Sequence, residues 1–111
     1  FIDNLVSAAK ELIKTNYILG NFSVESISEV LHVSNSYLSK IFKQKTGKTL
    51  VEYLIDTRLS RSAELISTTN MTAKQIAYIV GYNDEIHFLK QFKQKYGVPT
   101  KKFRKDRLTL S

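Results

Sequence analysis

Apolar residues recur at helical spacing along most of this chain, and the clearest case follows Thr72. Thr72 with Gln75 three residues later forms the capping-box pattern that starts a helix. Apolar residues then occur at i, i+3 and i+4, which is the spacing of one helical face. The pattern predicts a short helix over residues 73–80. The inward face of this helix consists of Ile76, Ile79 and Val80.

A second, longer helix is predicted after a tight turn. Gly81 lacks a Cβ and can take the left-handed conformation that ends a helix, and Asn83 or Asp84 can cap the next one. That next helix runs from about 84 to 96 and ends at Gly97, with apolar residues at i, i+4 and i+8. The buried stripe consists of Phe88, Phe92 and Tyr96.

The chain contains this pair of helices twice. The phrase "FKQKTG" at 42–47 returns as "FKQKYG" at 92–97, and the match extends over 23–54 and 72–104 with one residue, Asp84, inserted at the turn. Apolar positions pair with apolar positions throughout, which indicates one structural unit used twice. The corresponding apolar positions of the first copy are Ile27, Val30 and Leu31, which face inward in the short helix, and Tyr37, Leu38, Ile41 and Phe42 in the longer one.

Each copy has the layout of a helix-turn-helix: a short helix, a turn of three to four residues, and a longer helix with basic residues on its outer face. In the first copy, Ser34 is placed to cap the longer helix. The predicted fold class is all-α, with about seven helices and two helix-turn-helix motifs joined by a long linker helix. The helices are expected near 3–17, 24–31, 35–46, 50–66, 73–80, 84–96 and 100–107. Within 1–111 they form a leading segment 1–22, a first motif 23–47, a linker helix 49–67, a second motif 72–97 and a closing helix 99–107.

The linker helix has apolar residues on two sides, whereas a surface helix needs only one apolar stripe. One side holds Leu50, Tyr53 and Leu54, and the other holds Val51, Ile55, Leu59, Ala63 and Ile66. We therefore expect this helix to have neighbours on both sides and to hold the two motifs apart.

Composition is that of a compact folded chain, with 42% apolar and 24% charged residues. The absence of Cys excludes disulfides and Cys-based zinc sites, and His32 and His87 are too far apart in sequence to suggest a metal pair. No metal and no cofactor are expected. No apolar run is long enough for a membrane span and the first residues lack the pattern of a signal peptide, so we expect a cytoplasmic location. The chain begins at Phe1, which suggests a piece of a longer protein whose missing part lies upstream.

Positive charge is concentrated around the second motif. The chain carries a net charge of +7 with a pI near 9.7, which favours a polyanionic partner. Residues 1–22 are balanced in charge, whereas 90–107 are rich in Lys and Arg and hold a single acid, Asp106. The positive charge is therefore concentrated around the repeated segment at 92–97.

The stretch "IAYIVGY" followed by "FLKQFKQKYGVPTKKFR", with "YLIDTRL" at 53–59, resembles the DNA-binding domain of AraC/XylS-type bacterial transcription regulators over about residues 23 to 107. The resemblance implies homeodomain-like repeats, double-stranded DNA as partner, an RNA polymerase contact, and a sensor or receiver domain upstream. The leading "ELIKTNYILGNFSVESI" is most similar to members at the C-terminus of response regulators. This sequence departs from the family where Ser28 and His32 replace the Ala and Gly of the second motif, and we expect strain at His32 because it carries a Cβ.

The resemblance also implies which residues contact DNA, at the exposed N-terminal half of each second helix. The base-contact candidates are Asn35, Ser36, Ser39 and Lys40 in the first motif and Glu85, Ile86, Leu89 and Lys90 in the second. The phosphate-contact candidates are Lys43, Lys93, Lys95, Lys101 and Lys102. Arg58 and Arg104 are open between DNA contact and internal pairing with acids or carbonyls. Because the second set is less polar, we expect the first motif to read the more stringent half of an asymmetric, two-part site.

Two other classes of function compete with DNA binding. An enzyme would need paired titratable groups in a pocket or a nucleophile with its base, and the acids here are scattered without such an arrangement, so the chain is predicted not to be an enzyme. A helical protein-protein interaction module is the alternative. Its mark would be an exposed apolar groove and no salt-dependent affinity for DNA.

Overall fold

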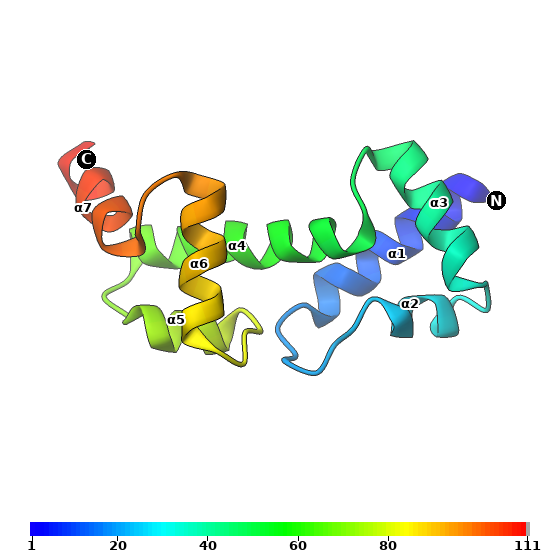
Figure 1. Ribbon diagram of the computed structural model, residues 1–111, viewed down its shortest axis with the longest axis horizontal. Coiled ribbons are helices and arrows are strands. Elements are labelled where there is room, and N and C mark those ends of the chain that lie inside the picture. The colour runs from blue at the N-terminus through cyan, green and yellow to red at the C-terminus, as the bar shows by residue number, and fades with distance from the viewer. Residues whose placement is uncertain (111) are drawn as a thin grey trace. The chain divides into compact units, whose positions relative to one another are not determined.

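A computed structural model describes residues 1–110 of the chain and contains seven α-helices, with no strand among those residues (Figure 1). The helices are α1 (Ile2–Asn16), α2 (Glu25–Val30), α3 (Asn35–Thr46), α4 (Leu50–Thr68), α5 (Ala73–Ile79), α6 (Glu85–Tyr96) and α7 (Thr100–Leu110). The all-α fold and the order of the helices are as predicted. The largest differences are at α4 and α7, which end two and three residues later than expected.

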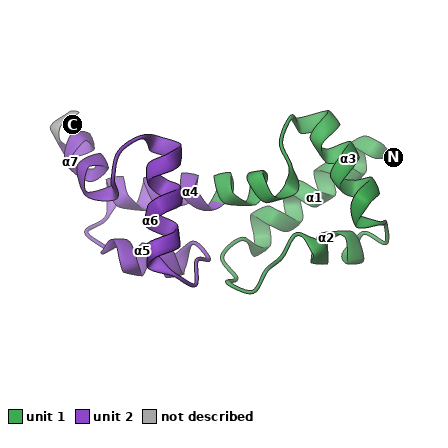
Figure 2. Cartoon of the chain, in the orientation of Figure 1, with its two compact units in different colours: residues 1–57 green, residues 58–111 purple. Residues whose placement is uncertain are grey.

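The helices gather into two compact units, which Figure 2 shows in different colours. Unit 1, Phe1–Thr57, holds α1, α2, α3 and the start of α4. Unit 2, Arg58–Ser111, holds the rest of α4 with α5, α6 and α7. Each unit therefore contains one of the two predicted motifs.

Unit 1 is built around α3, against which α1 and α2 pack. Phe42 is fully buried, and its ring meets that of Tyr53 edge to face with centroids 5.4 Å apart. The buried core of the unit consists of Leu5, Val6, Ala9, Ile13, Ile27, Leu38, Ile41, Phe42, Leu50 and Leu54. The leading helix is thus part of the first motif's core, since four of these residues belong to α1.

Unit 2 is built around aromatic rings on α6. Phe88 and Phe92 are fully buried as predicted, and the Phe92 ring lies 4.6 Å from Tyr96 and 5.2 Å from Phe103, between ring centroids. Tyr96 is only half-buried, and its hydroxyl donates a hydrogen bond to the Leu59 carbonyl oxygen at 3.3 Å. The stripe therefore joins α6 to both α4 and α7.

Local side-chain hydrogen bonds set the helix ends. Thr72 and Gln75 form the full capping box at the start of α5, as expected. The Ser34 and Asp84 side chains accept from backbone N–H groups in the first turns of α3 and α6. These bonds satisfy donors that a helix leaves unpaired at its N-terminus.

Some apolar positions expected to face inward are exposed instead. Val30 and Ile79 have relative exposures of 56% and 44%, and Val51 and Tyr37 are also exposed. Val30 and Ile79 are the last residues of α2 and α5. Such short helices bury only a narrow stripe, and the next residue, Val80 in the second copy, turns into the core instead. The prediction that both apolar sides of the linker helix are covered by neighbours is wrong at Val51, which is exposed.

The turns of the two motifs share one left-handed position, occupied by His32 in unit 1 and Gly81 in unit 2. The φ angles are 57° and 102°, and the two N–H groups donate to the Glu29 and Tyr78 carbonyls at 3.3 and 3.2 Å. A Cβ in this conformation costs about 1–2 kcal/mol. The expected unfavourable backbone at His32 is therefore confirmed.

Replacing His32 with Gly should raise the free energy of unfolding by about 0.5–1 kcal/mol, because relief of the left-handed Cβ outweighs the added freedom of the unfolded chain. Urea denaturation would measure the gain. As a matched control, Gly97→Ala introduces a Cβ at φ 79° into open space and should cost about 1–2 kcal/mol. A His32→Gly protein less stable than wild type would contradict backbone strain at His32.

Candidate nucleic-acid interface

The first motif presents a polar outer face on α3. Ser34 accepts a hydrogen bond from the Tyr37 N–H at 3.1 Å and so fixes where α3 begins. Residues three and four apart share a helical face, and the four base-contact candidates of this helix all lie exposed in its first half. These residues are Asn35, Ser36, Ser39 and Lys40. The structure therefore brings them together on one solvent-facing surface rich in hydrogen-bonding groups.

The second motif presents a more apolar face on α6. Asp84 accepts a hydrogen bond from the Ile86 N–H at 2.9 Å and so fixes where α6 begins. The Ile86 side chain is 78% exposed. Lys90 is exposed, whereas Glu85 and Leu89 are each half-buried. Fewer polar groups are thus available on α6 than on α3.

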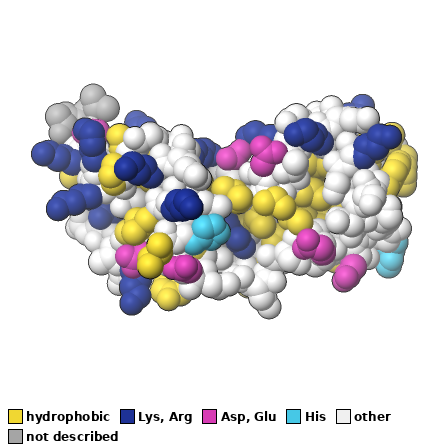
Figure 3. Space-filling model, in the orientation of Figure 1, with side chains coloured by type: hydrophobic (Ala, Val, Ile, Leu, Met, Phe, Trp, Pro, Cys, Tyr) yellow, Lys and Arg dark blue, Asp and Glu magenta, His cyan; other side chains and the backbone are white. Residues whose placement is uncertain are grey.

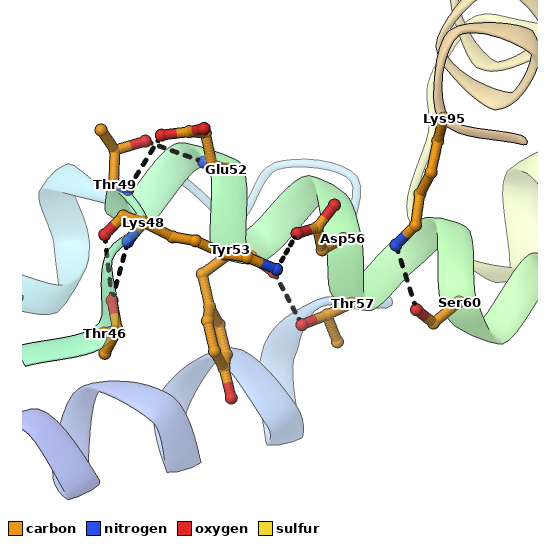
Figure 4. Close-up of polar contacts among 9 residues, drawn as sticks. All are labelled: Thr46, Lys48, Thr49, Glu52, Tyr53, Asp56, Thr57, Ser60 and Lys95. Atoms are coloured by element: carbon orange, nitrogen blue, oxygen red, sulfur yellow. Dashed lines mark hydrogen bonds and ion pairs between the residues drawn. The ribbon is translucent and has the colours of Figure 1, made fainter. Parts of the chain in front are cut away.

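All five phosphate-contact candidates are exposed, and two of them, Lys95 and Lys102, also have a partner within the fold. The other three are Lys43, Lys93 and Lys101. The Lys95 ammonium lies 3.3 Å from the Ser60 hydroxyl (Figure 4) and 5.5 Å from the Tyr96 ring centroid, and Lys102 pairs with Asp106 at 3.3 Å. Figure 3 shows more Lys and Arg side chains over unit 2 than over unit 1 on the face in view.

Arg104 has internal partners. Its Nε donates to the Ile66 carbonyl at 2.9 Å and one Nη donates to the Met71 carbonyl at 2.7 Å. The guanidinium thus ties α7 to the end of α4 and to the loop before α5. Of the two roles open for this residue, pairing with carbonyls is the one that the structure supports.

Replacing Arg104 with Ala should lower the free energy of unfolding by about 2–4 kcal/mol, because two part-buried carbonyls lose charge-assisted hydrogen bonds. Arg104→Lys should recover only part of this loss, since an ammonium cannot reproduce the planar fork. Thermal and urea denaturation would measure both. Lys101→Ala on the same helix serves as the control, and equal stability of Arg104→Ala and Lys101→Ala would contradict the bracing role.

Arg58 is half-buried over the Tyr82 ring, 5.8 Å from its centroid. Burial lowers the pKa of the Arg58 guanidinium and raises the pKa of Tyr82 to about 12, so the phenol stays protonated at neutral pH. The Tyr82 hydroxyl donates to the Gln91 side-chain oxygen. This link between the turn and α6 was missed in the sequence, where Tyr82 carries no signal beyond an aromatic after Gly81.

Polar contacts also fix the start of α4 (Figure 4). Thr49 and Glu52 exchange two hydrogen bonds of 3.0 Å, and the backbone N–H of Thr49 is the main cause that lowers the pKa of the Glu52 carboxyl. Lys48 forms an ion pair with Asp56, and this hydrogen-bonded contact raises the Lys48 pKa. Lys48 is thereby engaged within unit 1.

A family model described as a helix-turn-helix domain matches residues 27–106, which include both motifs and the helix between them. The chain belongs to the AraC-type helix-turn-helix family. The resemblance seen in the sequence is therefore confirmed, and with it the general class of a DNA-binding domain in transcription regulators.

Known AraC-type relatives agree with this assignment. The Msm operon regulatory protein of Streptococcus mutans is 34% identical over 91% of this chain and 36% of its own length. The C-terminal domain of AraT, a response regulator from Geobacillus stearothermophilus, is 31% identical and superposes with a TM-score of 0.89 over 92% of this chain and 84% of that one. The DNA-binding domain of AdpA, solved with target DNA, shares the fold at 19% identity and a TM-score of 0.80, over 95% and 90% of the two chains.

The chain spans only about a third of the length of the curated relatives it matches, with 36% and 35% of the first two covered. Within the part that the structure describes, no helix is long and apolar enough to cross a membrane. The same residues hold no cluster of three or more His, Cys, Asp or Glu side chains that suits a metal ion.

Proposed function

We propose that this AraC-type domain binds double-stranded DNA sequence-specifically, with α3 and α6 as recognition helices in consecutive major-groove segments. The observation that carries the proposal is the repetition of one motif, in which the second helix of each copy presents exposed side chains in its N-terminal half, next to lysines. Successive major-groove faces recur about every 34 Å, or roughly 10 base pairs. One chain with two motifs thereby contacts two half-sites, as repressors usually do by dimerising. Because the two motifs differ, the site is asymmetric rather than an obligate palindrome.

The two recognition helices have different chemistry to offer bases. In α3, Asn35 suits adenine and Lys40 suits guanine O6 and N7, with Ser36 and Ser39 as adaptable partners. In α6, Ile86 or Leu89 can meet a thymine methyl, Glu85 can accept from cytosine N4, and Lys90 can donate to guanine or to a phosphate. Lys43, Lys93, Lys95, Lys101 and Lys102 add phosphate contacts that position the helices.

The remaining parts of the function concern the longer protein. The likeness to the AraT C-terminal domain, which belongs to a response regulator, supports a receiver or sensor domain upstream of this chain. We further infer RNA polymerase as a partner and a cytoplasmic location. We infer that this domain binds DNA without catalysing a reaction. The alternative is a helical protein-protein interaction module, which the exposed Val30, Tyr78 and Ile79 side chains would serve.

The proposal is tested by binding to labelled duplexes over a range of salt, followed by hydroxyl-radical footprinting. Log K should fall linearly with log salt by about 0.9 per phosphate contact, and the footprint should show two protected segments roughly 10 base pairs apart. Affinity that does not change between low and physiological salt would contradict DNA binding and favour the interaction module.

A further inference from the structure

The two recognition helices differ at three of the four positions proposed to meet bases, and they share most of the exposed residues that follow. The exposed or half-buried positions that precede Lys40 and Lys90 all differ between the copies, whereas from Lys40 and Lys90 onward most exposed positions are the same. The differing pairs are Asn35 and Glu85, Ser36 and Ile86, Tyr37 and His87, and Ser39 and Leu89. The identical pairs are Lys40 and Lys90, Lys43 and Lys93, Gln44 and Gln94, and Lys45 and Lys95.

Core packing does not explain this identity. The identical residues named above are exposed. Among the buried positions, Phe42 and Phe92 are identical and Leu38 stands opposite Phe88, but buried Ile41 stands opposite half-buried Gln91, where the expected pairing of apolar with apolar positions fails. A repeat kept only for its fold preserves its core and lets its surface drift. In these two helices the buried Phe is kept, and exposed residues that the core does not require are kept as well.

Lys45 and Lys95 have partners within the fold, whereas the two glutamines do not. Lys45 lies 3.7 Å from Asp3, and Lys95 lies 3.3 Å from Ser60, so these two lysines have different partners in their two units. The Gln44 and Gln94 side chains are exposed and make no hydrogen bond with any described residue. A partner outside the chain that is the same for both motifs would account for their identity.

A recognition helix in a major groove meets two kinds of surface. Base edges differ from one half-site to the next, while the phosphodiester backbone is chemically the same in both. Residues that face bases are therefore free to diverge, and residues that face the backbone are not. Gln44 and Gln94 lie one turn beyond Lys40 and Lys90 and next to Lys43 and Lys93, on the side that carries the shared lysines.

We propose that Gln44 and Gln94 form an equivalent pair of backbone contacts, in which each side-chain amide donates a hydrogen bond to a DNA phosphate oxygen. The inference rests on the proposed function and extends the phosphate-contacting surface beyond lysines. A neutral amide there supplies the directional hydrogen bond that fixes the register of the helix along the groove, in addition to the charge that the lysines supply.

Gln44→Glu and Gln94→Glu test the proposal, because each replaces a donor with a carboxylate facing phosphate. Each should weaken binding to a preferred and to an unrelated duplex by the same factor, about tenfold or more at low salt, with base preferences unchanged. Gln44→Met and Gln94→Met remove the donor alone and should cost about two- to tenfold. Asn4→Glu, at an exposed position on α1, changes the charge equally and should stay within about twofold.

The variants should fold, since Glu and Gln have similar helix propensity, and circular dichroism checks this. Glu variants that bind like Asn4→Glu would overturn the proposal while wild-type binding stays intact. A loss confined to one base pair would also overturn it, in favour of a base contact. A wild-type chain that binds no duplex would instead contradict the proposed function.

Discussion

Replacing Lys40, Lys43, Lys90 and Lys93 together with Ala is expected to weaken DNA binding by at least about a thousandfold at low salt, because each charge-assisted contact contributes about 1 kcal/mol or more. All four side chains are exposed on the two recognition helices. The slope of log K against log salt should become shallower by about 0.9 for each of them that contacts phosphate. Fluorescence anisotropy with a labelled duplex over a salt series gives both values.

The control for this variant is Lys10→Ala with Lys14→Ala on α1, compared per charge removed. These lysines lie outside the two motifs, so their loss should act only through long-range attraction that salt screens. If the fourfold variant bound DNA as tightly as wild type, or lost no more per charge than the α1 variant, the two recognition helices would not be the DNA-binding surface.

Replacing Phe92 with Ala is expected to lower the free energy of unfolding of unit 2 by about 3–5 kcal/mol, the usual loss for a large buried aromatic. Phe92 is fully buried, and its ring contacts Phe88, Tyr96 and Phe103. Because small domains are only marginally stable, this loss should remove binding by the second motif. Urea denaturation followed by circular dichroism measures the stability.

Two further variants serve as comparisons for Phe92→Ala. Phe42→Ala removes the fully buried counterpart in unit 1 and should cost a similar amount there. Ile86→Ala changes an exposed side chain of the same helix as Phe92 and should stay within about 0.5 kcal/mol. A Phe92→Ala protein that loses less than about 1 kcal/mol would contradict the aromatic core described for unit 2.

Much of this fold could be predicted because its decisive interactions are local. Capping by Thr72 with Gln75 and by Ser34 involves residues within one helical turn. Gly97 ends α6 because its backbone takes the left-handed conformation that Gly adopts without strain. The stripe of Phe88 and Phe92 depends only on helical spacing. Such features can be read from short stretches, and the internal repeat supports each of them a second time.

Other features could not be predicted because they join residues that are distant in sequence. The two carbonyls that Arg104 binds lie 38 and 33 residues away, and both of its roles were consistent with the sequence. Val30 and Ile79 have apolar side chains at helical spacing, yet the short length of α2 and α5 leaves them exposed. Helical period alone does not show how wide a stripe the neighbouring helices cover.

All four base-contact candidates on α3 are exposed, as expected, whereas on α6 only Ile86 and Lys90 are exposed, since Glu85 and Leu89 are half-buried. Exposure shows which side chains are available to a partner. The base or phosphate that each one meets stays a prediction, because it depends on how DNA lies against the two motifs.

The most direct test of two-part reading is a selection of randomised duplexes against wild type, Lys40→Ala, Lys90→Ala and Leu89→Ala, scored position by position. Wild type should select two segments roughly 10 base pairs apart, with more information in the segment that α3 reads. Lys40→Ala should relax preference at one or two base pairs of that segment by about 1–3 kcal/mol. Lys90→Ala should weaken binding uniformly, and Leu89→Ala should change preference only where a thymine is selected. Equal information in both segments, or unchanged preferences in Lys40→Ala, would contradict this division between α3 and α6.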